Sequence, residues 1–213
     1  MNTNILPTLV TSHGFRHAYQ TGSSSRTLLM LHGTGGTELD LLPLGRSLAS
    51  DAALLSPRGK ILEQGMPRFF RRMAEGVFDE EDLIYRTHEL ADFIVGAAAE
   101  YGLDAGKVYA VGYSNGANIA GALLLLRPEV LAGAALIRPM VPLVPDTLPD
   151  LKGKPVLLAA AHQDSIVPGE NTRRLAALLK SAGAEVTVRF ENAGHNLTTY
   201  TVETTRRWLA ERR

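Results

Sequence analysis

The chain has 213 residues, with 22 basic and 22 acidic side chains and therefore a formal net charge of zero. That balance gives no electrostatic preference for nucleic acid or an anionic membrane surface, which leaves small molecules as the expected partners. The sequence has no cysteine, which excludes a disulfide framework, a thiolate zinc site and a cysteine nucleophile.

We expect a single domain over residues 1–213, because no repeat, charge block or low-complexity linker divides the sequence. A chain of this length buries roughly 70% of its unfolded surface, enough for one well-packed core. The first ten residues lack the basic start and apolar core of a signal peptide. No apolar run approaches the roughly eighteen residues of a membrane span. A cytoplasmic location without stable membrane insertion is therefore expected.

Short apolar runs alternate along the chain with segments of helical spacing, which predicts an α/β fold in layers. A polar antiparallel hairpin at the sheet edge is expected over residues 9–20. Several of the later runs are continuously apolar, as in parallel strands covered by helices on both faces. These strands are predicted at residues 27–31, 52–56, 107–111, 132–137, 155–160 and 185–190.

Helices are predicted between the strands, at residues 40–49, 79–101, 115–126, 170–181 and 199–213. The clearest is 79–101, where apolar residues recur at helical spacing from Leu83 to Tyr101. Asp79 suits the positive N-terminal end of this helix, and Gly102 suits its stop. Five prolines in the stretch 139–155 predict an ordered crossing loop instead of a long helix.

The most specific signal is the run Gly112-Tyr113-Ser114-Asn115-Gly116, which follows the predicted strand 107–111 and begins the predicted helix 115–126. A nucleophile elbow requires this context, because its serine lies in a strained turn with the hydroxyl exposed. The flanking glycines remove side chains that would collide with the neighbouring strand and helix. The alternative is a chance match in a glycine-rich chain, which the surrounding strand and helix disfavour. Ser114 is the predicted nucleophile.

A serine hydroxyl is a weak nucleophile at neutral pH, so it needs a histidine base and an acid that orients the base. After a nucleophile elbow, the acid precedes the histidine in the chain. Of the two later histidines, His162 and His195, only His195 lies in a loop after the last predicted strand, which makes it the predicted base. Asp164 directly follows the predicted strand 155–160 and is the predicted acid. Its alternative role is a turn-former or helix cap ahead of Pro168.

Acyl transfer also needs N–H donors aimed at the developing oxyanion. One is the backbone N–H of Asn115, which follows the nucleophile. The other is assigned to Thr34, in the glycine-rich loop His32-Gly33-Thr34-Gly35-Gly36 after the strand 27–31. A nucleotide-phosphate loop is the competing interpretation, but the final glycine of G-x-G-x-x-G is missing and no Gly-Lys-Ser/Thr follows.

The remaining histidines predict neither a second catalytic base nor a metal site. His32 is expected to fix the oxyanion loop by a hydrogen bond and not to act as a base. No metal site is expected, because the histidines are scattered and no two share a helix face at the spacing of H-E-x-x-H.

Taken together, residues 31–36, residues 112–118, Asp164 with Val167-Pro168, and Gly194-His195 resemble the phospholipase/carboxylesterase family of α/β hydrolases. The resemblance covers nearly the whole chain. Residues 56–59 and 65–72 look like the bacterial branch of small carboxylesterases, which includes hydrolases linked to quinone and hydroquinone stress. The sequence departs from the family beside the acid, with Ala161 for a common glycine and Ser165 for a common proline.

The resemblance implies the α/β-hydrolase fold, a triad of Ser114, Asp164 and His195, an oxyanion hole from the N–H groups of Thr34 and Asn115, and no cofactor. It also suggests a homodimer. No inserted lid domain is expected in so short a chain, which favours small or short-chain carboxylic esters, cleaved through an acyl-enzyme on Ser114. Two alternatives stay open: a thioesterase or lysophospholipase of the same fold, and a non-catalytic ligand receptor.

The segment 65–78 has two competing interpretations. In the first, its apolar side chains wall the acyl pocket and its arginines contact anions. In the second, the aromatic residues belong to the core and the arginines pair with surface acids. The residues concerned are Met66, Phe69 and Phe70, with Arg68, Arg71 and Arg72.

Overall fold

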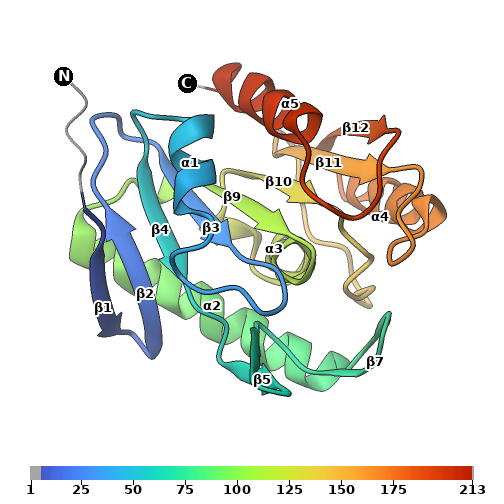
Figure 1. Ribbon diagram of the computed structural model, residues 1–213, viewed down its shortest axis with the longest axis horizontal. Helices are drawn as coiled ribbons and strands as arrows, with labels where there is room; N and C mark the ends of the chain where they lie inside the picture. The colour runs from blue at the N-terminus through green and yellow to red at the C-terminus, as the bar shows by residue number, and fades with distance from the viewer. Residues whose placement is uncertain (1–5, 213) are drawn as a thin grey trace.

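A central sheet of eight strands, in the order β1-β2-β4-β3-β9-β10-β11-β12, organises the computed structural model, which describes residues 6–212 (Figure 1). The β1–β2 and β2–β4 pairs are antiparallel, and every later pair is parallel. The expected parallel sheet with an antiparallel hairpin at its edge is confirmed. The strands are β1 (Thr8–Ser12), β2 (Phe15–Gln20), β3 (Thr27–Leu31), β4 (Ala53–Pro57), β9 (Val108–Tyr113), β10 (Gly133–Ile137), β11 (Pro155–Ala161) and β12 (Glu185–Glu191).

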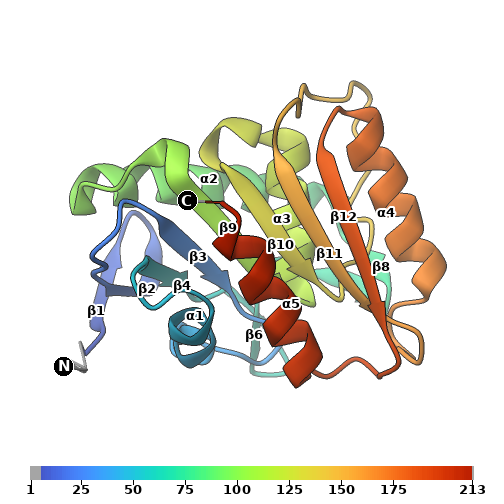
Figure 2. The same ribbon diagram turned by 90° about the horizontal axis from the view of Figure 1, so that it is seen from above.

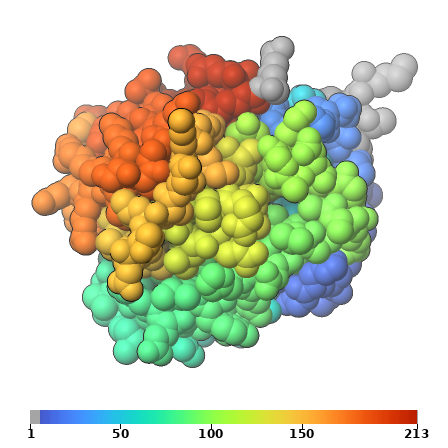
Figure 3. Space-filling model, turned by 180° about the vertical axis from the view of Figure 1, so that it is seen from behind, coloured from blue at the N-terminus to red at the C-terminus, as the bar shows by residue number. Residues whose placement is uncertain are grey.

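Helices cover both faces of the sheet, as Figure 2 shows. α2 (Glu80–Tyr101), α3 (Asn115–Leu126) and α4 (Gly169–Ser181) pack on one face, where they bury one apolar cluster. Figure 3 views the molecule from this side, where residues coloured green to orange form most of the surface. α1 (Leu42–Leu48) and α5 (Thr199–Ala210) pack on the other face around a second cluster. Short 3-10 turns, η1 (Ala105–Lys107) and η2 (Pro128–Val130), precede β9 and β10.

The longest helix, α2, has the ends that its sequence predicts. The Asp79 carboxylate accepts a hydrogen bond from the backbone N–H of Asp82 at 3.1 Å, which satisfies one of the first-turn donors. Gly102 ends the helix in the left-handed conformation, with φ of 66°. Within residues 6–212, neither α2 nor any other helix combines the length and apolar character needed to cross a membrane.

Some predicted boundaries are wrong by one to three residues. The helix expected at 40–49 begins only at Leu42, because the Asp40 carboxylate binds the N–H and hydroxyl of Thr37, both at 2.9 Å, and closes a turn there. β9 continues two residues beyond the predicted 111 and reaches Tyr113, which pairs with Ile137 of β10. The last helix ends at Ala210, and the final residue of its predicted range lies outside the described residues.

The excursion between β4 and α2 contains strands that the sequence did not predict. It forms two small hairpins, β5 (Ile61–Glu63) with β6 (Met66–Arg68) and β7 (Arg72–Ala74) with β8 (Val77–Phe78). The proline-rich stretch 138–154 crosses the molecule without a helix or strand, as expected. Both segments leave the carboxyl ends of parallel strands, the edge at which ligands bind in open α/β sheets.

Candidate active site

Ser114 lies in the sharp turn between β9 and α3 with φ of 52° and ψ of −113°, a conformation that residues other than glycine rarely adopt. The turn is anchored because the Ser114 N–H donates to the Ile137 carbonyl oxygen at 2.9 Å. Added side chains would not fit around it. A Cβ on Gly116 would come within 2.0 Å of the Leu31 carbonyl oxygen, and one on Gly112 within 2.4 Å of the Gly116 oxygen. The sequence pattern of the elbow therefore follows from close backbone packing.

The three predicted triad residues come together from the loops after β9, β11 and β12. His195 Nε2 lies 2.9 Å from Ser114 Oγ, and His195 Nδ1 lies 2.8 Å from Asp164 Oδ2. Because an ionised carboxylate only accepts, Nδ1–H donates to Asp164, which leaves Nε2 free to accept the Ser114 hydroxyl proton. Asp164 Oδ1 is occupied separately, since it accepts from the N–H groups of Ile166 and Val167, both at 2.9 Å.

Asp164 therefore forms the turn that its alternative interpretation predicted and also binds His195. It does form the turn ahead of Pro168 through one oxygen, while the other oxygen orients His195. The carboxylate is 1% exposed and the imidazole 16% exposed, so the acid is shielded from water while the imidazole keeps some contact with solvent. That arrangement keeps a single tautomer of His195 facing Ser114.

The two expected oxyanion donors are linked by one segment. Asn115 is the first residue of α3, so its backbone N–H has no carbonyl four residues earlier in the helix to bind. Its side-chain Oδ1 accepts from the Phe69 N–H at 2.8 Å, while Arg68 donates to the Thr34 hydroxyl at 2.8 Å. The N–H of Gly35 donates to the Pro67 carbonyl at 2.9 Å. Three consecutive residues, 67–69, therefore hold both donor segments.

His32 bonds on both sides of its ring, which fixes its tautomer. The Gly59 N–H donates to Nε2 at 3.0 Å, so Nδ1 carries the proton and donates to the Gly33 carbonyl at 2.7 Å. Burial lowers the pKa of His32, which keeps the ring neutral. His32 therefore fastens the loop 32–36 to the segment after β4, and both of its ring nitrogens are occupied by these hydrogen bonds.

The segment 65–78 follows the second of its two interpretations. Phe69 and Phe70 are buried in the core, and Phe69 contacts the His32 ring. Met66 stays 40% exposed and lies near the oxyanion loop, because a Cβ on Gly35 would lie 3.7 Å from its sulfur. The arginines pair with acids: Arg68 and Arg72 with Glu63, and Arg71 with Asp79 and Asp82.

Two residues that sequence reasoning missed also touch this site. Arg138 is fully buried after β10 and binds the loop that carries His195, and Tyr113 donates to the His195 carbonyl at 3.1 Å. The available signal was a charged residue at the end of the apolar run Ala134-Ala135-Leu136-Ile137, a position where an unpaired charge is costly.

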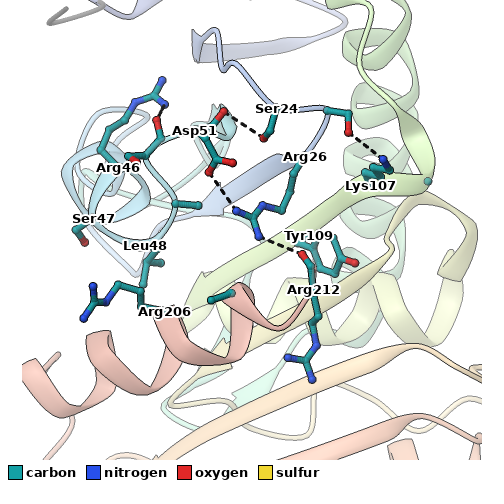
Figure 4. A pocket seen from close by; sticks show the side chains of 15 residues that line it. Ser24, Arg26, Arg46, Ser47, Leu48, Asp51, Lys107, Tyr109, Arg206 and Arg212 are labelled. Atoms are coloured by element: carbon teal, nitrogen blue, oxygen red, sulfur yellow. Dashed lines mark hydrogen bonds and ion pairs between the residues drawn. The ribbon is translucent and has the colours of Figure 1, made fainter. Parts of the chain in front are cut away.

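A hollow of about 710 Å³ lies away from Ser114, at the amino ends of the parallel strands near the starts of β3 and β9 (Figure 4). Its lining is rich in arginine, but these groups already serve the fold. Arg26 donates to Asp51 and to the carbonyls of Leu209 and Arg212. Among the described residues that line it, none is a histidine, so it offers no base for a serine. Within residues 6–212, no three metal-ligating side chains form a group suited to a metal ion.

Comparison with known proteins places this chain among hydrolases. Residues 74–206 match the model of the dienelactone hydrolase family. The chain is 50% identical over 196 residues to the Bacillus subtilis (strain 168) protein named Putative hydrolase MhqD, which covers 92% of this chain and 98% of that one.

Solved structures with similar folds carry the same kind of name. A Bacillus cereus carboxylesterase is 50% identical with a TM-score of 0.90 and covers 92% of this chain and 94% of that one. A Mesorhizobium loti carboxylesterase is 34% identical with a TM-score of 0.90, over 96% and 98% of the two chains. The expected resemblance to bacterial carboxylesterases and the α/β-hydrolase fold are confirmed.

Proposed function

This chain belongs to the dienelactone hydrolase family, and from that premise we propose that it is a serine carboxylesterase acting through an acyl-enzyme on Ser114. The observation that carries the proposal is the unbroken pair of hydrogen bonds from Ser114 through His195 to Asp164, at 2.9 Å and 2.8 Å. The names of the Bacillus cereus and Mesorhizobium loti relatives support the same type of reaction.

In the proposed mechanism, His195 Nε2 takes the Ser114 proton as the hydroxyl oxygen attacks the ester carbonyl carbon. Asp164 stabilises the imidazolium, and the N–H groups of Thr34 and Asn115 donate to the oxyanion. The imidazolium then protonates the departing alcohol, which leaves the acyl group on Ser114. Water, deprotonated by His195, attacks the acyl carbon, and the intermediate collapses to the carboxylic acid as the imidazolium returns the proton to the departing Ser114 oxygen.

The proposed substrates are small or short-chain esters without charge. Most of the exposed large apolar side chains lie on the segments that leave the carboxyl ends of β3, β4, β10 and β11, the edge where Ser114 lies. They are Leu39, Leu62, Met66, Met73, Val77, Val144, Leu148 and Ile166. The arginines of segment 65–78 pair with acids, so they leave little net positive charge to recruit an anionic ester.

The nucleophile is tested with Ser114→Ala. This variant is expected to lose hydrolysis of short-chain p-nitrophenyl esters while keeping its fold, because only the attacking oxygen is removed. A fluorophosphonate probe should label the native protein and fail to label the variant. Ser47→Ala, at an exposed serine in the far hollow, is the matched control and should retain both properties.

Ordinary turnover by Ser114→Ala would refute the nucleophile assignment. A native protein that binds esters but neither turns them over nor reacts with the probe would favour the ligand-receptor alternative. Circular dichroism and a thermal unfolding midpoint close to that of the native protein establish that the loss is chemical and not a loss of fold.

A further inference from the structure

Three consecutive backbone carbonyls of the loop that carries His195 are each bound by a side chain from the neighbouring strand ends. Arg138 Nε donates to the Gly194 carbonyl at 3.2 Å, and Arg138 Nη2 to the Asn196 carbonyl at 3.1 Å. Between them, the Tyr113 hydroxyl donates to the carbonyl of His195 itself at 3.1 Å. The peptide units on both sides of the base are therefore tied to the sheet.

We propose that Arg138, assisted by Tyr113, is a positioning residue that holds His195 at hydrogen-bonding distance from Ser114. The inference rests on the proposed function, because it concerns the same triad. Arg138 acts through His195 and does not touch the reacting atoms, so its effect belongs to the geometry of proton transfer and not to ester binding.

The place of Arg138 in the sheet fits this role. Tyr113 and Ile137 are paired in the parallel register of β9 and β10, so Ser114 and Arg138 occupy equivalent positions one residue later. Both have left-handed φ angles, 52° and 56°. The N–H of Ser114 donates to the Ile137 carbonyl at 2.9 Å, and that of Arg138 to the Ala159 carbonyl at 2.8 Å. Ser114 and Arg138 thus follow two neighbouring strands, β9 and β10, which Figure 2 shows side by side.

An ion pair with Glu191 holds the Arg138 guanidinium in place. The Arg138 side chain is 0% exposed and pairs with Glu191 at the end of β12, with Nη2 2.6 Å from Oε1. Glu191 also accepts from the hydroxyls of Thr198 and Thr201, on the far side of the same loop. Burial alone would raise the pKa of Glu191, but these hydrogen bonds and Arg138 lower it, so the pair stays charged.

A buried guanidinium must satisfy its donors, and here carbonyls of the base loop do so. Nη1 donates to the Ala159 carbonyl at 3.1 Å, in the strand that leads to Asp164, and Nε lies 4.0 Å from Asp164 Oδ2. One side chain therefore contacts the loop of the base and the strand of the acid. Displacing a catalytic group by about 1 Å costs on the order of 10²-fold in rate, so a clamp of this kind has a measurable kinetic effect.

The test uses Arg138→Met combined with Glu191→Gln, because the single change would leave Glu191 buried as an unpaired charge and could prevent folding. We expect kcat for a short-chain ester to fall about 10²-fold, with KM within about threefold of the native value. Arg138→Lys keeps the charge but not the planar fork, so its loss should be intermediate. Tyr113→Phe should lower kcat less than the double variant does, because it removes only one neutral hydrogen bond.

A readout independent of turnover is the low-field proton resonance of His195 Nδ1–H, assigned by its disappearance in His195→Ala. It should broaden or vanish in the double variant, even if the native protein hydrolyses no ester, which separates this inference from the proposed function. The matched control is Arg46→Met. Arg46 also donates to backbone carbonyls, those of Thr21, Ser50 and Ala52, but lines the hollow at the amino ends of the strands (Figure 4).

The inference is overturned if the folded double variant keeps the native kcat, if only KM rises, or if the His195 resonance is unchanged. It is equally overturned if Arg46→Met lowers kcat as much, because the effect would then belong to general loss of stability. Measurements well below the unfolding midpoint of each variant keep the two effects apart.

Discussion

Asp164 divides its two oxygens between two tasks, and this division makes it the most informative single residue to change. Oδ1 closes a turn through the N–H groups of Ile166 and Val167, and Oδ2 holds His195 Nδ1. An asparagine preserves an oxygen for the turn but presents an amide N–H₂ to the imidazole. The histidine must then offer the wrong tautomer to Ser114.

We therefore predict that Asp164→Asn lowers kcat by about 10⁴-fold while the protein stays folded, as measured by ester hydrolysis and thermal unfolding. Asp150→Asn is the matched control. Its carboxylate likewise accepts from the N–H two residues later, at 2.9 Å from Lys152, but lies far from His195 in the crossing loop. A rate for Asp164→Asn within tenfold of the native one would transfer the orienting role to another group.

For individual residues, the sequence predicted the types and chain order of the candidate triad but not the contacts that hold these side chains in place. The candidate triad of Ser114, Asp164 and His195 was recognisable because each of the three residues follows a predicted strand. Arg138 was not, because its hydrogen-bond partners lie 21 to 63 positions away in the chain and its left-handed backbone has no glycine to mark it.

Among the elements, α3 depends most on close packing. Gly116 lets its first turn approach β3, where an added Cβ would meet the Leu31 carbonyl oxygen at 2.0 Å. Gly121, one and a half turns later, has its nearest neighbour at 3.4 Å, the ring of Pro142, which is ordinary contact. The two glycines of one helix therefore differ sharply in the space around them.

Replacing each with alanine should separate packing from helix propensity. Gly116→Ala is expected to destabilise the protein by about 1–3 kcal/mol or more and to reduce activity, because α3 is pushed from the strand that leads to the oxyanion loop. Gly121→Ala should be neutral or stabilising by up to about 1 kcal/mol, because alanine favours a helix interior over glycine. Urea unfolding of both variants provides the comparison, and equal effects would contradict the packing argument.

The elements themselves were largely predictable, because long apolar runs and long periodic segments carry strong signals. The exception is the excursion between β4 and α2, whose strands have only two or three residues each. Such strands are too short for alternation to appear in the sequence. They are nonetheless the elements that place residues 67–69 against the oxyanion loop.

Across the whole molecule, Glu38 joins three distant segments. Its carboxylate is 0% exposed and binds Arg16 in β2 and Arg58 after β4. Burial acts to raise the pKa of Glu38, but hydrogen bonds from its own backbone N–H and from both arginines outweigh burial and lower it. The loop after β3 is thus tied to the sheet by an ionised carboxylate.

A carboxyl whose pKa is lowered on folding adds stability above its unfolded pKa of about 4.3, and that stability is lost as the pH falls through the folded value. Glu38→Gln should therefore cost about 2 kcal/mol at neutral pH and progressively less below about pH 4, measured by urea unfolding across the range. Glu203→Gln, at an exposed pair with Arg206 and Arg207, should change little at any pH. Parallel profiles for Glu38→Gln and the native protein would contradict this.

Strand order was the part of the architecture that the sequence could not supply. β3 lies between β4 and β9, and these three are separated along the chain by a helix and by the excursion with α2. Spacing along the chain records where strands occur but not which edges hydrogen-bond. The pairing depends on contacts between distant segments, and in the structure α1 and α5 pack on one face of the sheet and α2 to α4 on the other.

The matched register of Ser114 and Arg138 has a consequence for protein engineering. Because these residues leave adjacent strands at equivalent positions of the register, the spacing of their backbones is set by the interstrand distance of about 4.8 Å, which backbone hydrogen bonding sets for any sequence. The main chain therefore sets the relative positions of these two residues. New loops or fusion partners grafted at the amino ends of the strands, around Asp51 and Gly106, should leave this backbone spacing unchanged. Deleting one residue from β10 would instead turn Arg138 to the other side of the sheet.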